Sequence, residues 1–175
     1  MSELGSAPVP EPGADDHLRG WEAADLPPVI LYADFECPFC AALHERFNGP
    51  ARPAVRIAFR HFPVRSSHPR AWPAACAAEA AGRQGRFWEM HDALFADTAR
   101  LEDPHLWDRA RALGLDVERF EADRRGDAVR DRVKRDFRSG VRAGVVTTPT
   151  LFRPGTDGVF QAVPVAELAS RLARR

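Results

Sequence analysis

The sequence predicts an α/β fold in which an all-helical insertion separates a strand–helix–strand half from a C-terminal strand–strand–helix half. An uncharged run at 29–33 marks a central strand, helical periodicity dominates the middle of the chain, and sheet patterns return only near its end. The 175 residues suffice for one globular domain with a subdomain. We divide the chain into a flexible N-terminal tail at 1–16, the first half at 17–69, the helical insertion at 70–142 and the last half at 143–175.

The first half is predicted to contain a parallel strand pair after the tail. Residues 1–16 combine Pro, Gly, Ser and acidic residues with almost no large apolar side chain, which predicts a mobile segment. The run at 29–33 follows two prolines and suits a strand buried on both faces. A helix from Cys37 to Phe47 has Pro38 in its first turn and a stop at Asn48-Gly49-Pro50. Alternating residues at 55–59 predict a second strand, so the two strands and their crossover helix form a right-handed parallel unit.

The rest of the chain is predicted as helices followed by a hairpin and a last helix. Between about 70 and 142, apolar residues recur at helical spacing, separated by glycines and by Asp103-Pro104, and predict four or five short helices. Strand patterns return at Val145-Val146, at 150–152 and at 159–160, with a turn between the last two. An amphipathic helix from Pro164 to Arg174 closes the chain.

Composition excludes several classes of function. The 25 basic and 25 acidic residues balance, and no basic run carries interleaved aromatics, so we expect no nucleic-acid partner. No apolar run is long enough to cross a bilayer, and the N-terminus lacks a basic region followed by an apolar one. We therefore expect no membrane partner and a cytoplasmic location. Three cysteines are too few for a disulfide-stapled scaffold, so the close pair Cys37 and Cys40 needs another explanation.

The motif Cys37-Pro38-Phe39-Cys40 lies where the apolar strand meets the helix. One helical turn brings both sulfurs within disulfide range. We expect the first thiol to project beyond the helix end and the second to be shielded, so that Cys37 attacks and Cys40 resolves. Free N–H groups and the positive end of the helix dipole favour the Cys37 thiolate, which is the reactive form. The motif therefore predicts thiol–disulfide exchange.

Zinc binding is one alternative for such a cysteine pair. A structural zinc site needs four ligands, and the sequence has no second pair. His44, four residues after Cys40 on the same helix face, is the nearest further ligand, but a packed or surface histidine is the commoner case. We therefore expect no metal. Cys76 lies among small residues in a predicted helix, where a cysteine usually acts as a small hydrophobe.

A second candidate site is Thr147-Thr148-Pro149-Thr150, which directly precedes a predicted strand. Proline cannot donate to a sheet ladder. At the start of a strand it marks either an edge strand with an ordinary trans bond or a cis turn. Taken alone, these residues favour the trans bond.

Four segments along the chain form an ordered pattern. They are Tyr-Ala-Asp-Phe-Glu-Cys-Pro-Phe-Cys at 32–40, Phe-Arg-His-Phe-Pro at 59–63, Gln-Gly-Arg-Phe-Trp-Glu-Met-His-Asp-Ala-Leu-Phe at 84–95 and Thr-Thr-Pro-Thr-Leu-Phe at 147–152. Together they resemble the DsbA-like thiol–disulfide oxidoreductases of the thioredoxin superfamily. The resemblance covers about residues 16 to 174, and four ordered motifs are far more specific than one cysteine pair.

The resemblance implies a thioredoxin-like fold interrupted by the helical insertion. It implies Cys37 as the attacking cysteine, Cys40 as the resolving one, and Pro149 as a cis-proline that follows Thr148 and faces the pair. It also implies protein or small thiol and disulfide substrates, a redox partner and no cofactor. Phe39 stands where strongly oxidising members have histidine, so we expect a smaller pKa depression at Cys37 than in those members.

Three further residues match the family segments, and one rival function stays open. We expect His61, Trp88 and His91 to be packing residues, because His91 falls on an apolar helical face. The rival is a non-catalytic redox sensor or binding module, in which the disulfide state changes a surface that a partner recognises. Slow or absent turnover with thiol reductants would favour that rival.

Overall fold

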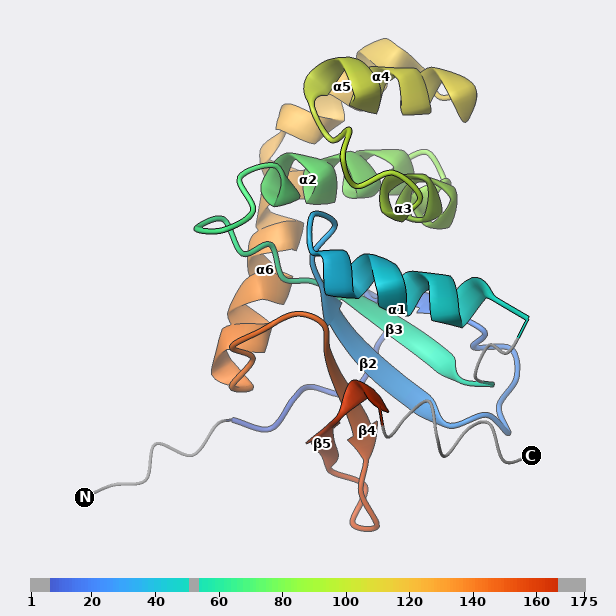
Figure 1. The fold of residues 1–175 in the computed structure, drawn as a ribbon, viewed down its shortest axis with the longest axis vertical. Coiled ribbons are helices and arrows are strands. Elements are labelled where there is room, and N and C mark those ends of the chain that lie inside the picture. The colour runs from blue at the N-terminus through green and yellow to red at the C-terminus, as the bar shows by residue number, and fades with distance from the viewer. Residues whose placement is uncertain (1–6, 51–53, 167–175) are drawn as a thin grey trace.

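The protein, described here from a computed structural model over residues 7–50 and 54–166, is built on one five-stranded sheet (Figure 1). The strand order is β1-β3-β2-β4-β5, with β2 and β3 parallel and the other neighbours antiparallel. The strands are β1 (His17–Arg19), β2 (Pro28–Ala33), β3 (Arg56–His61), β4 (Thr150–Pro154) and β5 (Phe160–Val163). The helices are α1 (Pro38–Asn48), α2 (Ala71–Gly82), α3 (Phe87–Phe95), α4 (Asp103–Ala112), α5 (Val117–Arg125) and α6 (Asp127–Arg142).

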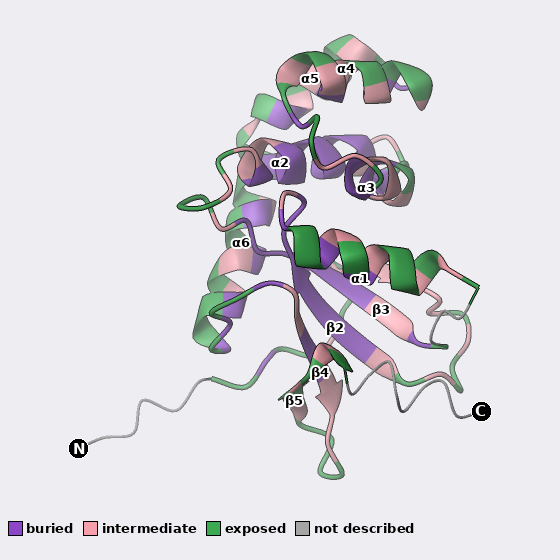
Figure 2. Ribbon diagram, viewed as in Figure 1, coloured by how far each residue is buried: buried purple, intermediate pink, exposed green. Residues whose placement is uncertain are grey.

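Strand β2 is the central strand of the sheet, between β3 and β4, and all its residues after Pro28 are buried (Figure 2). Val29 and Leu31 pack in the larger core, which α1 and the helices α2 to α5 cover. Ile30 and Tyr32 face the opposite side, in a second core with Phe137 of α6. The uncharged run at 29–33 predicted this placement, and the parallel pairing of β2 with β3 confirms the predicted unit.

The predicted helical insertion is confirmed as five helices, α2 to α6. Helix α2 is buried along most of its length and consists largely of alanine, so that neighbouring helices can approach it closely. Helix α6 runs from the insertion back to the sheet (Figure 1). Gly140 of α6 permits close contact with Phe62 and Tyr32. A Cβ atom at Gly140 would lie 2.6 Å from Cδ2 of Phe62 and 3.0 Å from Cδ1 of Tyr32.

Residues 7–16 differ from the mobile tail that the sequence predicts. The Ala7 N–H donates to the Arg142 carbonyl oxygen at 2.8 Å, and Val9 is buried in the second core. The Asp16 carboxylate forms an ion pair with Arg60, with an Oδ1 to Nε distance of 2.8 Å. A composition poor in apolar residues does not reveal these few anchoring contacts, because each depends on a distant partner. Residues 1–6 lie outside the described part of the chain.

The remaining differences concern short segments. Val145 and Val146 belong to no strand: Gly144, with φ of 81°, turns the chain at the end of α6, and Val145 is buried while Val146 is 90% exposed. Strand β1, only three residues long, was not predicted. The predicted hairpin is present as β4 and β5. Most of the predicted helix at 164–174 lies outside the described residues.

Candidate active site

Helix α1 places Cys37 at its N-terminus, as predicted. Cys37 is the N-cap, in extended conformation, and its carbonyl oxygen accepts the N–H groups of Cys40 and Ala41, both at 3.1 Å. Pro38 occupies the first helical position, where its missing N–H removes no hydrogen bond. The local sequence therefore determines that the Cys37 sulfur lies among the free N–H groups at the start of the helix.

The loop before β4 meets Cys37 from the other half of the fold. The Thr148–Pro149 peptide bond is cis, and Pro149 directly precedes β4. The Cys37 thiol donates a hydrogen bond to the Thr148 carbonyl oxygen, with an Sγ to O distance of 3.4 Å. The structure thus brings together the two segments that the sequence singled out separately.

The two sulfurs of the pair differ strongly in acidity. The pKa of Cys37 is lowered from 9.0 to about 5, first by a hydrogen bond from the Cys40 thiol, and further by backbone N–H groups, against the opposing effect of burial. The pKa of Cys40 is raised well above its ordinary value, mainly by burial. Near neutral pH the pair therefore holds one thiolate, at Cys37, and one thiol, at Cys40. The three cysteines, all among the described residues, form no disulfide in the structure.

The predicted difference in exposure between the two cysteines is wrong. Cys37 is 3% exposed and Cys40 is 2% exposed, because the loop that carries Thr148 covers the first thiol as well. Phe39, between them, is 72% exposed and offers an apolar ring to solvent beside the pair. The two cysteines have nearly the same exposed fraction, and they differ in acidity because hydrogen bonds lower the pKa of Cys37 whereas burial raises that of Cys40.

Two acidic residues that the sequence interpretation passed over hold the loop in front of α1. The Asp34 N–H donates to Cys40 Sγ at 3.5 Å, and Asp34 Oδ1 accepts the Glu36 N–H at 2.8 Å. The Glu36 carboxylate accepts two hydrogen bonds from Arg70, which leads into α2. An Asp that binds the N–H two residues later forms an Asx turn, and the sequence Asp34-Phe35-Glu36 was the available signal.

The residues expected to pack in the core do so, and each also has a polar partner. His61 Nε2 lies 2.8 Å from Glu79 Oε1, and His91 Nδ1 lies 2.9 Å from Oδ1 of Asp92. The Trp88 indole N–H donates to a backbone carbonyl of β1 at 3.1 Å. Cys76 is buried in α2 and burial raises its pKa to about 11, as suits a small hydrophobe.

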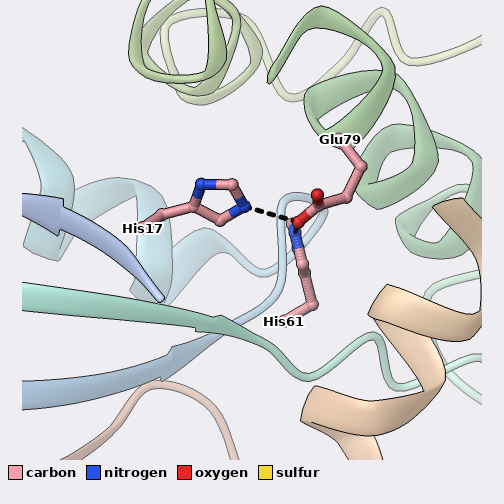
Figure 3. Close-up of side chains that lie close together, drawn as sticks. All are labelled: His17, His61 and Glu79. Atoms are coloured by element: carbon pink, nitrogen blue, oxygen red, sulfur yellow. Dashed lines mark hydrogen bonds and ion pairs between the residues drawn. The ribbon is translucent and has the colours of Figure 1, made fainter. Parts of the chain in front are cut away.

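Two clusters of histidine and carboxylate groups have donor atoms within 4.8 Å of one another and could hold a cation. They are His17, His61 and Glu79 (Figure 3), and His44, His91 and Asp92. Neither includes the cysteine pair. In each cluster an arginine already neutralises the carboxylate: Arg132 Nε lies 3.7 Å from Glu79, and an Arg19 nitrogen lies 2.9 Å from Asp92. We therefore describe both as ion-paired polar clusters, since a second cation would be repelled there.

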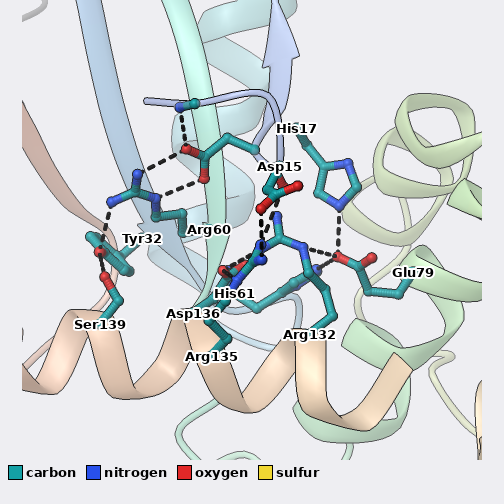
Figure 4. A network of polar contacts seen from close by, with 12 residues as sticks. Asp15, His17, Tyr32, Arg60, His61, Glu79, Arg132, Arg135, Asp136 and Ser139 are labelled. Atoms are coloured by element: carbon teal, nitrogen blue, oxygen red, sulfur yellow. Dashed lines mark hydrogen bonds and ion pairs between the residues drawn. The ribbon is translucent and has the colours of Figure 1, made fainter. Parts of the chain in front are cut away.

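The first of these clusters belongs to a longer polar network between the sheet and α6 (Figure 4). Asp136 of α6 accepts the backbone N–H of His61 at 3.2 Å and pairs with Arg132. Further along α6, Ser139 shares a hydrogen bond of 2.7 Å with the Tyr32 hydroxyl, which also accepts from Arg60. The network fixes α6 on the sheet and does not reach the cysteine pair.

A sheet of this order, with a dithiol at the first helix facing a cis-proline, is the architecture of thioredoxin-like proteins. The family model described as the DSBA-like thioredoxin domain matches residues 28–173, and the chain belongs to this family. The family is the one that the four sequence segments resemble, so that prediction is confirmed, together with the thioredoxin-like fold.

Solved structures with the same fold include several oxidoreductases. A thioredoxin-like oxidoreductase from Silicibacter pomeroyi is similar with a TM-score of 0.74 and 25% identity, over 93% of this chain and 94% of that chain. The oxidised BdbD protein of Bacillus subtilis shares the fold with a TM-score of 0.71 and 15% identity, over 98% of this chain and all of that chain.

Curated relatives carry this domain as part of a larger protein. Proteins named Na(+)/H(+) antiporter NhaA are 43% identical over 157 residues in Herminiimonas arsenicoxydans and 41% identical over 160 residues in Salinispora arenicola, each match covering 84% of this chain. The chain spans only about a quarter of the length of these relatives, 24% and 23%. Within residues 7–50 and 54–166, no helix combines the length and apolar character needed to cross a bilayer.

Proposed function

We propose that the protein exchanges disulfides with protein or small-molecule thiols through a mixed disulfide at Cys37, which Cys40 resolves. The observation that carries the proposal is the difference in acidity within the pair: the pKa of Cys37 is lowered to about 5, whereas that of Cys40 is raised. A thiolate that persists at neutral pH is a nucleophile and also a good leaving group. No metal or organic cofactor enters the reaction.

The proposed reaction has two displacements. The Cys37 thiolate attacks one sulfur of a substrate disulfide, forms a Cys37–substrate disulfide and releases the other substrate sulfur as a thiolate. Cys40 then loses its proton and attacks Cys37 Sγ, which forms the Cys37–Cys40 disulfide and releases the second substrate sulfur. The substrate gains two electrons and the pair loses two. The reverse sequence oxidises a substrate dithiol.

The proposed substrate contact is the loop before β4, because β4 itself lies between β2 and β5 and has no free edge. The Thr148 carbonyl oxygen lies 3.4 Å from Cys37 Sγ, and Pro149 follows Thr148 in the same loop. An extended segment bound along this loop would therefore present its sulfur to the thiolate. Val146, in the same loop, is 90% exposed, and Phe39, two residues after Cys37, is 72% exposed. Both offer apolar contact to a polypeptide or a small organic disulfide.

The test is turnover of a protein disulfide, such as that of insulin, with dithiothreitol as the electron donor. The wild-type protein should accelerate the reduction, Cys37→Ala should abolish the acceleration, and Cys76→Ala should leave it unchanged as the matched control. A wild-type protein whose Cys37 reacts with alkylating agents but which accelerates nothing would instead be the redox-sensing or binding module. The redox partner and a cytoplasmic location stay predictions.

A further inference from the structure

The second displacement of the proposed reaction needs a proton acceptor, because Cys40 is a buried thiol. Cys40 is 2% exposed, and the Asp34 N–H that donates to its sulfur cannot take a proton. The Asp34 carboxylate is occupied by the N–H groups of Glu36 and Val64 and by His68 Nδ1. The acceptor must therefore lie on another side of Cys40.

A small cavity joins Cys40 to two histidines. It lies between α1, the sheet and α3, and has a volume of about 20 Å³. A single water molecule needs roughly 10 to 15 Å³ of such volume and two to four polar neighbours. The polar groups that line the cavity are Cys40, His44, Asn48, His91 and Arg19, and the rest of the lining is apolar.

Asp92 determines the hydrogen-bonding state of both histidines. Its Oδ1 lies 3.0 Å from His44 Nε2 and 2.9 Å from His91 Nδ1, and the other oxygen accepts from Arg19 at 2.9 Å. Hydrogen bonds from these groups hold the pKa of Asp92 well below its ordinary value, against the opposing effect of burial, so the carboxylate is ionised and accepts only. Each ring must therefore donate its N–H to Asp92, which leaves His44 Nδ1 and His91 Nε2 as lone-pair acceptors.

His44 is the better placed of the two to pass a proton to solvent. Its side chain is 13% exposed, whereas that of His91 is 6% exposed. Burial lowers the pKa of His91 to about 4, so that ring resists protonation at neutral pH. His44 also follows Cys40 by four residues on α1, which places the two side chains on one face of the helix.

On the basis of the proposed function, we propose that His44, positioned by Asp92, accepts the proton of Cys40 through one water in this cavity. The Cys40 S–H bond breaks, the water hands a proton to His44 Nδ1, and the Cys40 thiolate attacks Cys37 Sγ of the mixed disulfide. The Cys37–Cys40 bond forms as the substrate thiolate leaves. His44 then releases the proton to solvent.

Charged groups of both signs lie around His44. The Asp92 carboxylate of α3 contacts the His44 ring, and Arg19 of β1 pairs with the same carboxylate. His91 from α3 lies with its ring 5.5 Å from that of His44 and stays neutral. Helix α1 itself carries the cysteine pair and, directly after His44, Glu45 and Arg46. A general base needs a free lone pair within reach of the proton, directly or through one water, and the His44 nitrogen that does not bind Asp92 supplies one.

The experiment separates the two displacements with an aryl disulfide, 5,5′-dithiobis(2-nitrobenzoate). Attack by Cys37 on the reagent releases one coloured thiolate, and attack by Cys40 on the mixed disulfide releases a second. Stopped-flow absorbance at a series of pH values is to be recorded for the wild type, His44→Gln and Asp92→Asn. His105→Gln, on the remote helix α4, is the matched control. All variants carry Cys76→Ala, which leaves only the two cysteines of interest.

His44→Gln should keep the rate of the first thiolate release within about twofold of the wild-type rate. It should slow the second release about 100-fold at neutral pH, which is the usual loss for a general base. The second release should then rise with pH about tenfold per unit, because hydroxide must replace the imidazole. Asp92→Asn should slow the second release in the same sense but less, and His105→Gln should change neither.

Two results would overturn the inference, and a third would overturn the proposed function instead. A second release that His44→Gln and Asp92→Asn both leave unchanged shows that another group takes the proton. Equal slowing of both releases, with an unaltered pH profile, shows a structural effect alone. Failure of the wild type to give any first release shows that Cys37 is not a nucleophile, whatever the role of His44.

Discussion

The Sγ atom of Cys37 lies 3.4 Å from the carbonyl oxygen of Thr148, although the two residues lie 111 positions apart in the chain. Cys37 caps the helix that follows β2, and Thr148 closes the loop that enters β4. Because β2 and β4 are paired in the sheet, the two loops emerge side by side. The site therefore forms only when the two halves separated by the helical insertion have joined.

Removal of one cysteine at a time should have unequal effects. Cys40→Ala in a Cys76→Ala background should still attack oxidised glutathione and accumulate a Cys37–glutathione disulfide, because nothing remains to resolve it. Cys37→Ala in the same background should accumulate none, since the Cys40 thiol is buried and its pKa is raised. Intact-protein mass spectrometry measures the adduct. An adduct on Cys37→Ala but not on Cys40→Ala would reverse the two roles.

Alkylation of reduced protein should report an acidic thiol. The rate of iodoacetamide reaction at Cys37 should rise with pH through a midpoint at about 5 and then level off, because only the thiolate reacts. Since the folded pKa lies below the unfolded value of about 8.5, ionisation stabilises the reduced protein fully above that value. The stabilisation is lost as the pH falls toward 5. A midpoint near 8.5 would show an unactivated cysteine, as expected of a binding module.

The reduction potential should lie between about −270 mV, the value for thioredoxin, and about −120 mV, the value for the strongest oxidants. A thiolate with a pKa of about 5 stabilises the reduced form, but Phe39 adds no positive charge to it. Phe39→His should therefore raise the potential, and Phe39→Ala, which is neutral, should change it much less. Equilibration with glutathione buffers measures all three proteins. Equal potentials for the histidine and alanine variants would refute the electrostatic explanation.

Loss of the carboxylate at Glu79 should destabilise the whole fold. Glu79 Oε1 accepts from His17 at 2.6 Å and from His61 at 2.8 Å, and these hydrogen bonds keep its pKa below the ordinary value despite burial. Glu79→Ala leaves His17 and His61 without their acceptor, and Arg132 keeps its pair with Asp136. The loss should cost about 3 to 5 kcal/mol of unfolding free energy. Urea denaturation measures this loss of unfolding free energy.

The control for this prediction is Glu89→Ala, because the Glu89 side chain is 46% exposed and, among the residues that the structure describes, pairs only with the exposed Arg86. That change should stay within about 0.5 kcal/mol. Acid should have the same effect as the Glu79 substitution. The stabilisation that the ionised Glu79 carboxylate provides is present above the ordinary carboxyl pKa of about 4.3, and it is lost as the pH falls through the lower pKa of Glu79 in the folded protein. A loss at Glu79 no larger than that of the control would show that the buried network contributes little.

The sequence by itself determined the features that depend on neighbouring residues. The uncharged run at 29–33 predicted a strand buried on both faces, and Pro38 after Cys37 placed that cysteine at a helix start. Apolar residues at helical spacing predicted the insertion. Each of these patterns repeats within a few residues, so it is visible without knowledge of the fold. The cis bond before Pro149 needed the family resemblance in addition, since the local sequence also suits a trans bond.

Tertiary structure alone decided which distant side chains meet. Strand β1 and the contacts of residues 7–16 have almost no local pattern, because their stability comes from β3, Arg60 and α6. The covering of the Cys37 sulfur depends on Thr148, which only the pairing of β2 with β4 brings near. The meeting of His44, from α1, with Asp92, from α3, likewise depends on how the insertion packs on the first helix. Contacts between residues far apart in the chain follow from packing, and no local periodicity encodes them.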